Sequence, residues 1–286
     1  MLGSVGDLVE DVVVRLHEQI NVASDTQATV VRRRGGSAAN VVAAARLVGG
    51  AARFIGQVGD DATGRSLTDA LAAVGADVAV RRAGRTGTII VLVDVAGERT
   101  MLSDRAACTA LVDPDPAWLD GLHTLHIPFY SMVGEPLAAT TATLAAWAVA
   151  RGIRVSVDAS SAAVLEHVGP ALALEQIRAL GPSVVLANEL EAATLGPRLH
   201  PDHLGGALVI IKQGPQPAIV LQTDLDPVEI PAEHVAQVHD TTGAGDAFAA
   251  GLLLSLAAGD DAITATRHAH AVAAQAVRHA SESQPD

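Results

Sequence analysis

The chain has 286 residues, 49% of them hydrophobic and 18% charged, which is the balance of a folded globular protein with room for one large α/β domain or two smaller ones. Its net charge of −13 disfavours binding to nucleic acid or to an anionic membrane surface, and no apolar run is long enough to span a membrane. With a single cysteine, Cys108, and no signal-peptide pattern at the N-terminus, the sequence predicts a cytoplasmic protein without internal disulfides.

Short apolar segments alternate along the chain with longer segments rich in alanine and leucine. The short ones have the length and composition of buried strands: 2–5, 52–58, 124–127, 154–157, 183–186 and 208–212. The longer ones predict helices: 38–47, 66–74, 137–150, 189–195, 247–257 and 262–279. This alternation indicates right-handed βαβ units, and therefore an α/β fold with a doubly wound, mostly parallel sheet flanked by helices.

Two segments, 12–34 and 78–102, interrupt the alternation with strand-like patterns and turn residues. In the second, residues 88–95 and 99–102 are separated by Ala96-Gly97, which is typical of a hairpin. We expect these insertions to form a small antiparallel β-sheet that serves as a lid over the carboxyl ends of the main strands, where open α/β sheets bind ligands. The predicted main domain then comprises residues 1–11, 35–77 and 103–286, and the lid comprises residues 12–34 and 78–102.

The most informative motif is the segment 240–246, Asp-Thr-Thr-Gly-Ala-Gly-Asp. Its small residues precede an apolar helix, so their backbone N–H groups can meet an anion such as phosphate at the positive end of the helix dipole. A carboxylate there, Asp246, repels a bound phosphate, and it is best explained as a base that takes a proton from an attacking hydroxyl. The alternative is an ordinary helix N-terminus capped by threonine or aspartate.

Two common nucleotide-binding motifs do not occur in the chain. The sequence has no G-x-x-x-x-G-K-[ST] segment, which excludes a Walker-type P-loop. It also has no G-x-G-x-x-G after the first predicted strand, which disfavours a dinucleotide-dependent dehydrogenase. A nucleotide is therefore expected to bind in another way.

The segment 35–40, Gly-Gly-Ser-Ala-Ala-Asn, and the motif 240–246 together resemble the two signatures of the ribokinase-like (PfkB) sugar kinase family. The resemblance extends over essentially the whole chain. It implies a doubly wound α/β domain with a small β lid, and transfer of the γ-phosphate of ATP, with Mg²⁺, to a hydroxyl of a sugar or sugar acid. It also implies that Asp246 is the catalytic base and that the anion hole consists of Gly243, Ala244 and Gly245.

By position, the resemblance assigns the binding of the sugar to Asp11, Gly36, Ser37 and Asn40, and to Arg99 at the predicted lid hairpin. An aspartate and an asparagine suit a polyol, since the first accepts hydrogen bonds and the second both donates and accepts them. The alternatives are a strand-end turn for Asp11, a polar residue at a helix N-terminus for Asn40, and an exposed surface arginine for Arg99. Ser37 stands where ribokinases often have a lysine, so ribose itself is not implied.

The resemblance assigns the nucleotide site to the following residues: Asn188, Lys212, Gly214, Gln216 and Gly245. The segment Asn188–Glu191 matches the family's N-x-x-E pattern, which implies Mg²⁺ held through water, and it is equally a helix capping box. Lys212 is the only lysine of the chain, and Pro217 stands where the family usually has a glycine. Oxygens of Asp240 and Thr242 could bind K⁺, as in some relatives.

Two other functions remain open from the sequence. A nucleoside kinase would use the same scaffold, but only 2% of the residues are aromatic, which leaves few side chains to stack on a base. A sugar sensor without catalysis would have no need of Asp246. We also expect that the exposed faces of the lid could pair in a homodimer.

Overall fold

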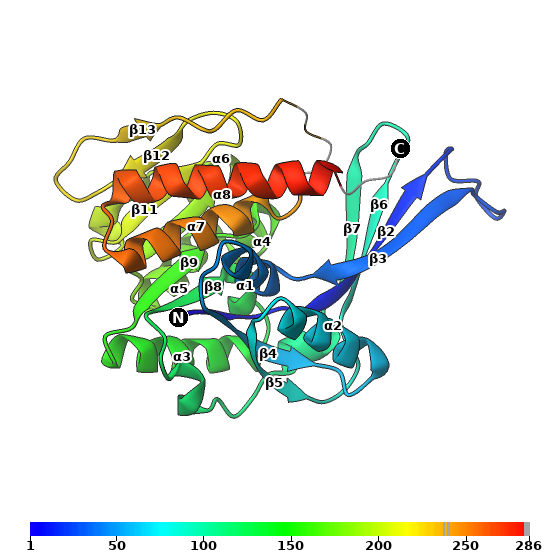
Figure 1. Ribbon diagram of the computed structural model, residues 1–286, viewed down its shortest axis with the longest axis horizontal. Helices are drawn as coiled ribbons and strands as arrows, with labels where there is room; N and C mark the ends of the chain where they lie inside the picture. The colour runs from blue at the N-terminus through cyan, green and yellow to red at the C-terminus, as the bar shows by residue number, and fades with distance from the viewer. Residues whose placement is uncertain (237, 239–240, 283–286) are drawn as a thin grey trace.

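The computed structural model describes residues 1–236, 238 and 241–282, with side chains through His279. Its larger sheet has the strand order β13-β12-β11-β10-β9-β8-β1-β4-β5 (Figure 1). These strands are β1 Leu2–Val5, β4 Ala52–Val58, β5 Asp77–Arg82, β8 Thr124–Pro128, β9 Arg154–Asp158, β10 Val184–Asn188, β11 Leu208–Lys212, β12 Ala218–Leu221 and β13 Val228–Ile230. All pairs are parallel except β11–β12 and β12–β13, so the sheet is mostly parallel, as predicted.

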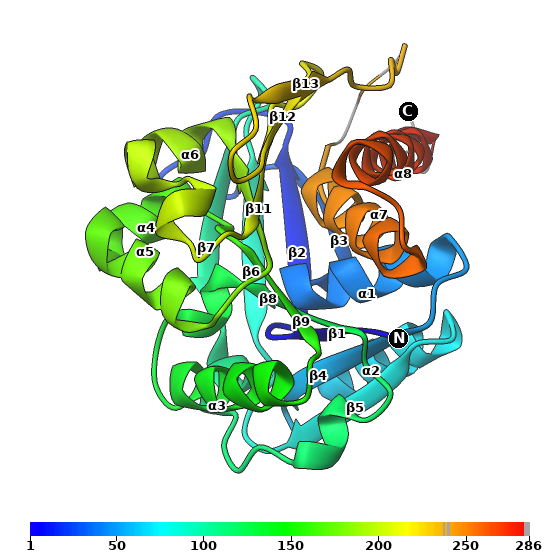
Figure 2. The same cartoon turned by 90° about the vertical axis from the view of Figure 1, so that its left-hand side faces the viewer.

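Helices cover both faces of this sheet (Figure 2). One layer contains α1 Ser37–Leu47, α2 Ala62–Ala73, α7 Ala244–Ala258 and α8 Ala262–Glu282, and the other contains α3 Leu137–Ala150, α4 Ala162–Val168, α5 Pro170–Ala179 and α6 Glu189–Leu195. Each layer encloses its own hydrophobic core against the sheet. This arrangement explains why the central strands are apolar on both faces.

The smaller sheet has the order β3-β2-β6-β7 and projects from the main body (Figure 1). Its strands are β2 Val9–Leu16, β3 Ala28–Gly35, β6 Thr88–Val93 and β7 Arg99–Asp104. The parallel pairing of β2 with β6 joins two segments that are far apart in the sequence. The hairpin predicted around Ala96-Gly97 is the β6–β7 hairpin.

The structure differs from the sequence-based expectation in several places. The small sheet is not wholly antiparallel, because β2 and β6 are parallel, and the strands β12 and β13 were not predicted. β5 pairs with β4 in the larger sheet because Val78 and Val80 pack against the main core, so the segment 78–102 is divided between the two sheets. Asp11 lies on β2 of the small sheet, although we placed it at the end of the main domain. Helices α4 and α5 were not predicted. The division into two domains stays a prediction.

The topology locates a crevice for ligands. β1 lies between β8 and β4 in the larger sheet. The strands β4 and β5 lie on one side of β1, and the later strands β8 to β13 lie on the other side, so the direction of strand addition reverses at β1. The carboxyl ends of the strands at such a switch point form a crevice.

A membrane-spanning helix needs both length and an apolar surface, and none of the helices in the described part of the chain combines the two.

Candidate active site

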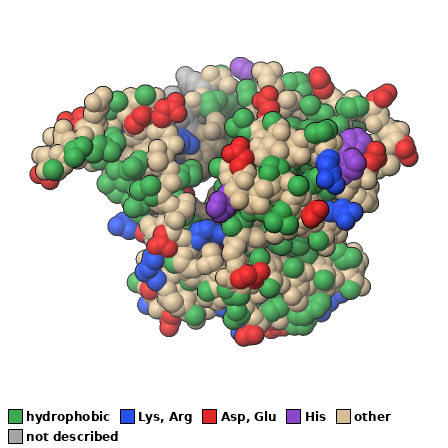
Figure 3. Space-filling view, turned by 180° about the vertical axis from the view of Figure 1, so that it is seen from behind, with side chains coloured by type: hydrophobic (Ala, Val, Ile, Leu, Met, Phe, Trp, Pro, Cys, Tyr) green, Lys and Arg blue, Asp and Glu red, His purple; other side chains and the backbone are tan. Residues whose placement is uncertain are grey.

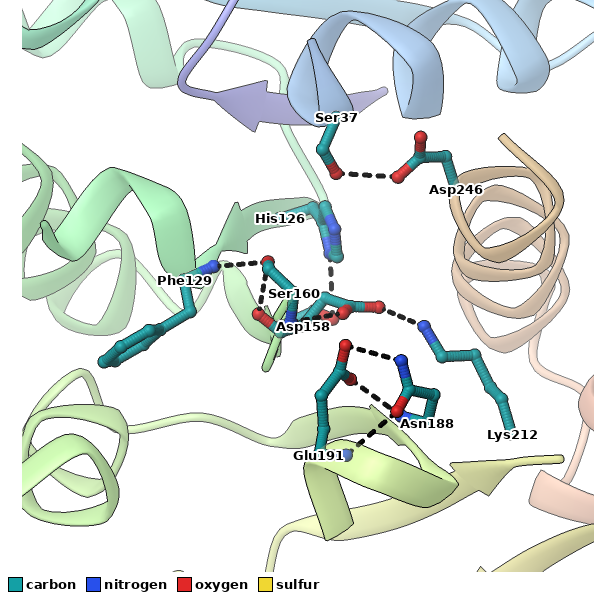
Figure 4. A network of polar contacts seen from close by, with 10 residues as sticks. Ser37, His126, Phe129, Asp158, Ser160, Asn188, Glu191, Lys212 and Asp246 are labelled. Atoms are coloured by element: carbon teal, nitrogen blue, oxygen red, sulfur yellow. Dashed lines mark hydrogen bonds and ion pairs between the residues drawn. The ribbon is translucent and has the colours of Figure 1, made fainter. Parts of the chain in front are cut away.

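Asp246 lies in the first turn of α7. Gly243, the residue that precedes this helix, has the left-handed conformation with a φ of 79°. Two side chains from the beginning of α1 hold its carboxylate. Ser37 Oγ donates to Asp246 Oδ1 at 2.6 Å (Figure 4), and Asn40 Nδ2 donates to Oδ2 at 3.0 Å. Ser37 and Asn40 share one face of α1 because they are three residues apart. The two signature segments therefore meet at this carboxylate.

The environment of Asp246 raises the pKa of its carboxyl group to about 6. Desolvation by the surrounding protein is the largest cause, and the nearby Asp158 adds to it, while the hydrogen bonds from Ser37 and Asn40 and the charge of Lys212 oppose it. Since a base is more effective when its pKa is closer to the working pH, this environment makes Asp246 a better proton acceptor than an exposed aspartate.

The N-terminus of α7 offers backbone donors next to Asp246. The N–H of Ala244 donates to Thr241 O at 3.1 Å, whereas those of Gly245 and Asp246 have no backbone acceptor among the described residues. A Cβ atom built on Gly245 would lie 3.5 Å from Lys212 Nζ. The only lysine of the chain is thus adjacent to the predicted anion hole, at the positive end of the helix.

Lys212 at the end of β11 forms an ion pair with Asp158 at the end of β9, with 2.5 Å between Nζ and Oδ2 (Figure 4). Desolvation alone would lower the pKa of Lys212, but the carboxylates of Asp158 and Glu191 outweigh it and raise the pKa. Lys212 therefore remains a cation although it is largely buried. Its place beside Gly245 allows it to attract an anion at the start of α7.

Asn188 and Glu191 form the predicted capping box at the start of α6. Asn188 N and Nδ2 donate to the two oxygens of Glu191, both at 2.7 Å. Burial, followed by the charge of Asp158, raises the pKa of Glu191 to about 7. A further cation bound near Glu191 would lower this pKa, because it would stabilise the ionised carboxylate.

The described residues contain no cluster of three or more His, Cys, Asp or Glu side chains able to hold a metal by themselves. Mg²⁺ takes few protein oxygens and keeps several waters, so one buried carboxylate such as Glu191 fits a water-mediated contact with an ion that is carried mainly by phosphates.

The residues predicted to bind the sugar lie around the junction of α1 with the small sheet. Asp11 packs against Gly35, where a Cβ atom would lie 2.0 Å from the carboxylate. Gly36 has a φ of 98° and leaves no room for a side chain, since a Cβ atom would lie 2.2 Å from Asp7 O. Gly36 is thus required by close approach of the backbone, whereas Gly35 leaves room for the side chain of Asp11.

The lid reaches the loop before α7 through Arg99, whose Nη1 donates to Thr242 Oγ1 at 2.8 Å. Gly214 and Gln216 lie in the exposed turn after β11, closed by a hydrogen bond from Gln216 N to Gln213 O. No contact among the described residues places these two beside Asp246. Asp240 lies outside the described residues.

Two charged residues near the site were missed by sequence reasoning: Asp158 and Arg105. Arg105 forms a two-pronged ion pair with Asp7, at 2.7 and 2.9 Å, which links the end of β7 to the loop after β1. Asp158 had a usable signal, since it follows a buried strand and therefore lies at the carboxyl edge of the sheet. Arg105 had none, because only the tertiary fold brings it to the crevice.

Comparison with known proteins identifies the family of the chain. Residues 2–285 match the model of the pfkB family carbohydrate kinases. A fructokinase of Klebsiella pneumoniae is 34% identical over 263 residues, covering 84% of this chain and 82% of that protein. An ATP-dependent ribose-1-phosphate kinase of Halopiger xanaduensis is 31% identical over 261 residues, covering 88% and 83%.

Solved structures share the fold at lower identity. An adenosine kinase of Anopheles gambiae superposes with a TM-score of 0.84 at 23% identity, over 100% of this chain and 98% of that one. This likeness shows the fold alone, whereas the family model extends over both signatures and the residues around Asp246. The chain belongs to the pfkB family of carbohydrate kinases, enzymes that transfer a phosphoryl group to an alcohol.

Proposed function

We propose that this protein transfers the γ-phosphoryl group of ATP to a hydroxyl of a sugar or sugar acid, with Asp246 as the base. The observation that carries the proposal is the position of the Asp246 carboxylate. Ser37 and Asn40 hold it at the N-terminus of α7, with the Lys212 ammonium on the other side. A base, a set of backbone donors and a fixed positive charge thus converge on one place.

The residues of this chain divide the reaction between them. Asp11 and Asn40 orient the sugar by hydrogen bonds to its hydroxyls. Asp246 removes the proton from the attacking hydroxyl as the new O–P bond forms, and the bond to ADP breaks. The N–H groups of Gly245 and Asp246, together with Lys212, stabilise the charge on the transferred group.

The nucleotide would lie on the Lys212 side of Asp246, at the carboxyl ends of β10 and β11. We propose that Asn188 and Glu191 contact bound Mg²⁺ through its waters, and that Gly214 and Gln216 border the nucleotide. Bound Mg²⁺ would supply charge neutralisation between the phosphates. A dependence on K⁺ through Thr242 and Asp240 stays a prediction.

Two alternatives are less well supported. The relatives named for fructose and for ribose 1-phosphate favour a sugar over a nucleoside. In addition, a cavity of about 520 Å³ beside Asp246 has no Phe, Tyr or Trp among the described residues of its lining, and His279 is the one ring there able to stack on a base. A sensor without catalysis would not need a desolvated carboxylate at a helix N-terminus, which costs stability at neutral pH.

The exposed apolar residues of the small sheet support a further proposal, a homodimer formed through the lid. They are Val30, Val31, Ile90, Met101 and Leu102. Figure 3 shows hydrophobic atoms on the projecting lid and a hollow between the lid and the main body. Exposed apolar side chains on a sheet are typical of a surface that another sheet covers.

The test is release of ADP from ATP and Mg²⁺ in the presence of pentoses, hexoses, their phosphates, sugar acids and nucleosides. We expect turnover with one class of sugar, and a decrease in kcat of at least about 10³-fold in Asp246→Asn, because the hydroxyl then has no base. Sugar binding, measured by calorimetry, should be retained. Turnover unchanged by Asp246→Asn would contradict the proposal.

A further inference from the structure

The cavity beside Asp246 has an unusual charge for this protein. It opens between α1, the start of α7, the C-terminal half of α8 and the strands β2 and β3. Its lining contains four basic side chains, Arg33, Arg34, Arg278 and His279, and one acidic side chain, Asp11. Since the whole chain carries a net charge of −13, this concentration of basic groups makes the cavity a place where an anion is attracted.

Arg34 is the basic residue closest to the catalytic network. Its Nη1 donates to Asn40 Oδ1 at 2.8 Å, and the ion pairs among the described residues do not include it. Desolvation lowers the pKa of Arg34, while the charges of Asp246 and Asp11 act in the opposite direction. The guanidinium is therefore partly withdrawn from water, yet its hydrogen-bond partner is a neutral amide.

Arg32, two residues earlier on the same strand, provides a contrast. Its side chain is 67% exposed and forms an ion pair with Glu10 at 2.6 Å. An exposed pair of this kind contributes little to stability. The strand thus carries one arginine that is paired at the surface, and another that lines the cavity.

Asn40 sets the distance between Arg34 and the base. The amide accepts from Arg34 through Oδ1 and donates to Asp246 through Nδ2, at 2.8 and 3.0 Å. A molecule whose hydroxyl lies at Asp246 can therefore place a second substituent against Arg34, one amide group away. A guanidinium has five N–H donors, and its fork matches the oxygens of a phosphate or carboxylate.

We propose that the sugar that this enzyme phosphorylates already carries an anionic substituent, a phosphate or a carboxylate, and that Arg34 binds it. The inference rests on the proposed kinase function and specifies its substrate. Asp11 and Asn40 bind hydroxyls, whereas Arg34 selects for charge. Arg33 also lines the cavity and increases the local positive potential, whereas the charge of Arg278 is balanced by its ion pair with Glu233.

The experiment compares the full-length protein with Arg34→Met and with the matched control Arg32→Met. The assay measures kcat/KM with ATP and Mg²⁺ for ribose against ribose 1-phosphate, fructose against fructose 1-phosphate, and glucose against gluconate and 2-keto-3-deoxygluconate. The phosphate and carboxylate compounds distinguish the two sources of the anion. We expect the unsubstituted enzyme to prefer an anionic compound by at least about tenfold.

Arg34→Met should lower kcat/KM for the preferred anionic compound by about 10- to 100-fold, the effect of one hydrogen bond to a charged group. The loss for neutral sugars should be smaller by at least about tenfold, since only the anionic substituent contacts Arg34 directly. Arg32→Met should behave as the unsubstituted enzyme. A preference for neutral sugars would overturn the inference. An equal loss on both classes would also overturn it, since Arg34 would then only orient Asn40.

Failure of the kinase function is distinguishable from failure of this inference. If none of the compounds is phosphorylated, the proposed function fails, and calorimetric titration of the same compounds decides the question of charge. Tighter binding of an anionic compound that is weakened in Arg34→Met would support the inference. Equal binding of neutral and anionic compounds, or binding that Arg34→Met does not alter, would overturn it.

Discussion

At the scale of single residues, Asp246 is subject to opposing influences on its proton affinity. Desolvation raises the pKa of its carboxyl group, while Ser37 and Asn40 stabilise the charged form by donating to it. The pKa of Asp246 in the folded state lies above its ordinary value. The contribution of this carboxyl group to the free energy of unfolding is therefore most favourable below about pH 4, and it is lost as the pH rises through about 6. The protein thus retains a charged base at neutral pH at a cost in stability.

Substitution of Ser37 by alanine tests this balance. If Asp246 is the base, as proposed, activity requires its ionised form, so kcat/KM should fall as the pH decreases through about 6. Ser37→Ala removes a donor to the carboxylate, which should raise its pKa and move this acidic limb upward by about one pH unit. The measurement is kcat/KM between pH 5 and 9, with the exposed Ser66→Ala as control. An unchanged limb would show that Ser37 does not set the pKa of Asp246.

At the scale of elements, the position of the catalytic turn depends on how α7 packs. α7 is apolar around most of its circumference and buried between α1 and α8. Gly251 allows α8 to approach closely, since a Cβ atom there would lie 2.9 Å from Val272 Cβ and 3.1 Å from Ala269 Cα. A glycine inside a helix normally costs stability, so close packing is the physical reason for this one.

Gly251→Ala should therefore lower the free energy of unfolding by about 1–3 kcal/mol, although alanine favours helix formation. The measurement is denaturant unfolding, and Ala258→Ser at the exposed end of the same helix is the control, with an expected change within about 0.5 kcal/mol. A stabilised Gly251→Ala variant would mean that α7 and α8 have room to separate, contrary to the packing described.

At the scale of the whole molecule, the small sheet carries apolar side chains that would be exposed to water in a monomer. All residues of β7 are exposed, including Met101 and Leu102. Arg99 on the same strand contacts Thr242 in the loop before α7, so association through the lid would be coupled to the site. The ion pair of Arg105 with Asp7 fixes the end of that strand to the main body.

If the lid forms a dimer, Met101→Glu should convert the protein to a monomer, because a buried carboxylate without a partner opposes association. Sedimentation velocity over a range of protein concentrations would measure this change. Leu172→Glu, an exposed leucine on α5, is the control and should leave the association state unaltered. An unsubstituted protein that sediments as a monomer at every concentration would contradict the dimer.

The sequence by itself determined the alternating α/β pattern, the two insertions and the two signature segments. It could do so because these depend on local periodicity and on glycines with no substitute, such as Gly36 and Gly243. It did not reveal that β5 joins the larger sheet, since an edge strand of alternating character fits either sheet equally well.

Only the tertiary structure decided which charges surround Asp246. Asp158, Lys212, Ser37 and Arg34 come from four separate elements, and a side chain's partners and desolvation depend on the packing of all of them. The sequence thus determined the type of reaction through its motifs. The tertiary structure decided the proton affinity of the base and the charge of the cavity, because both are sums over residues that are distant along the chain.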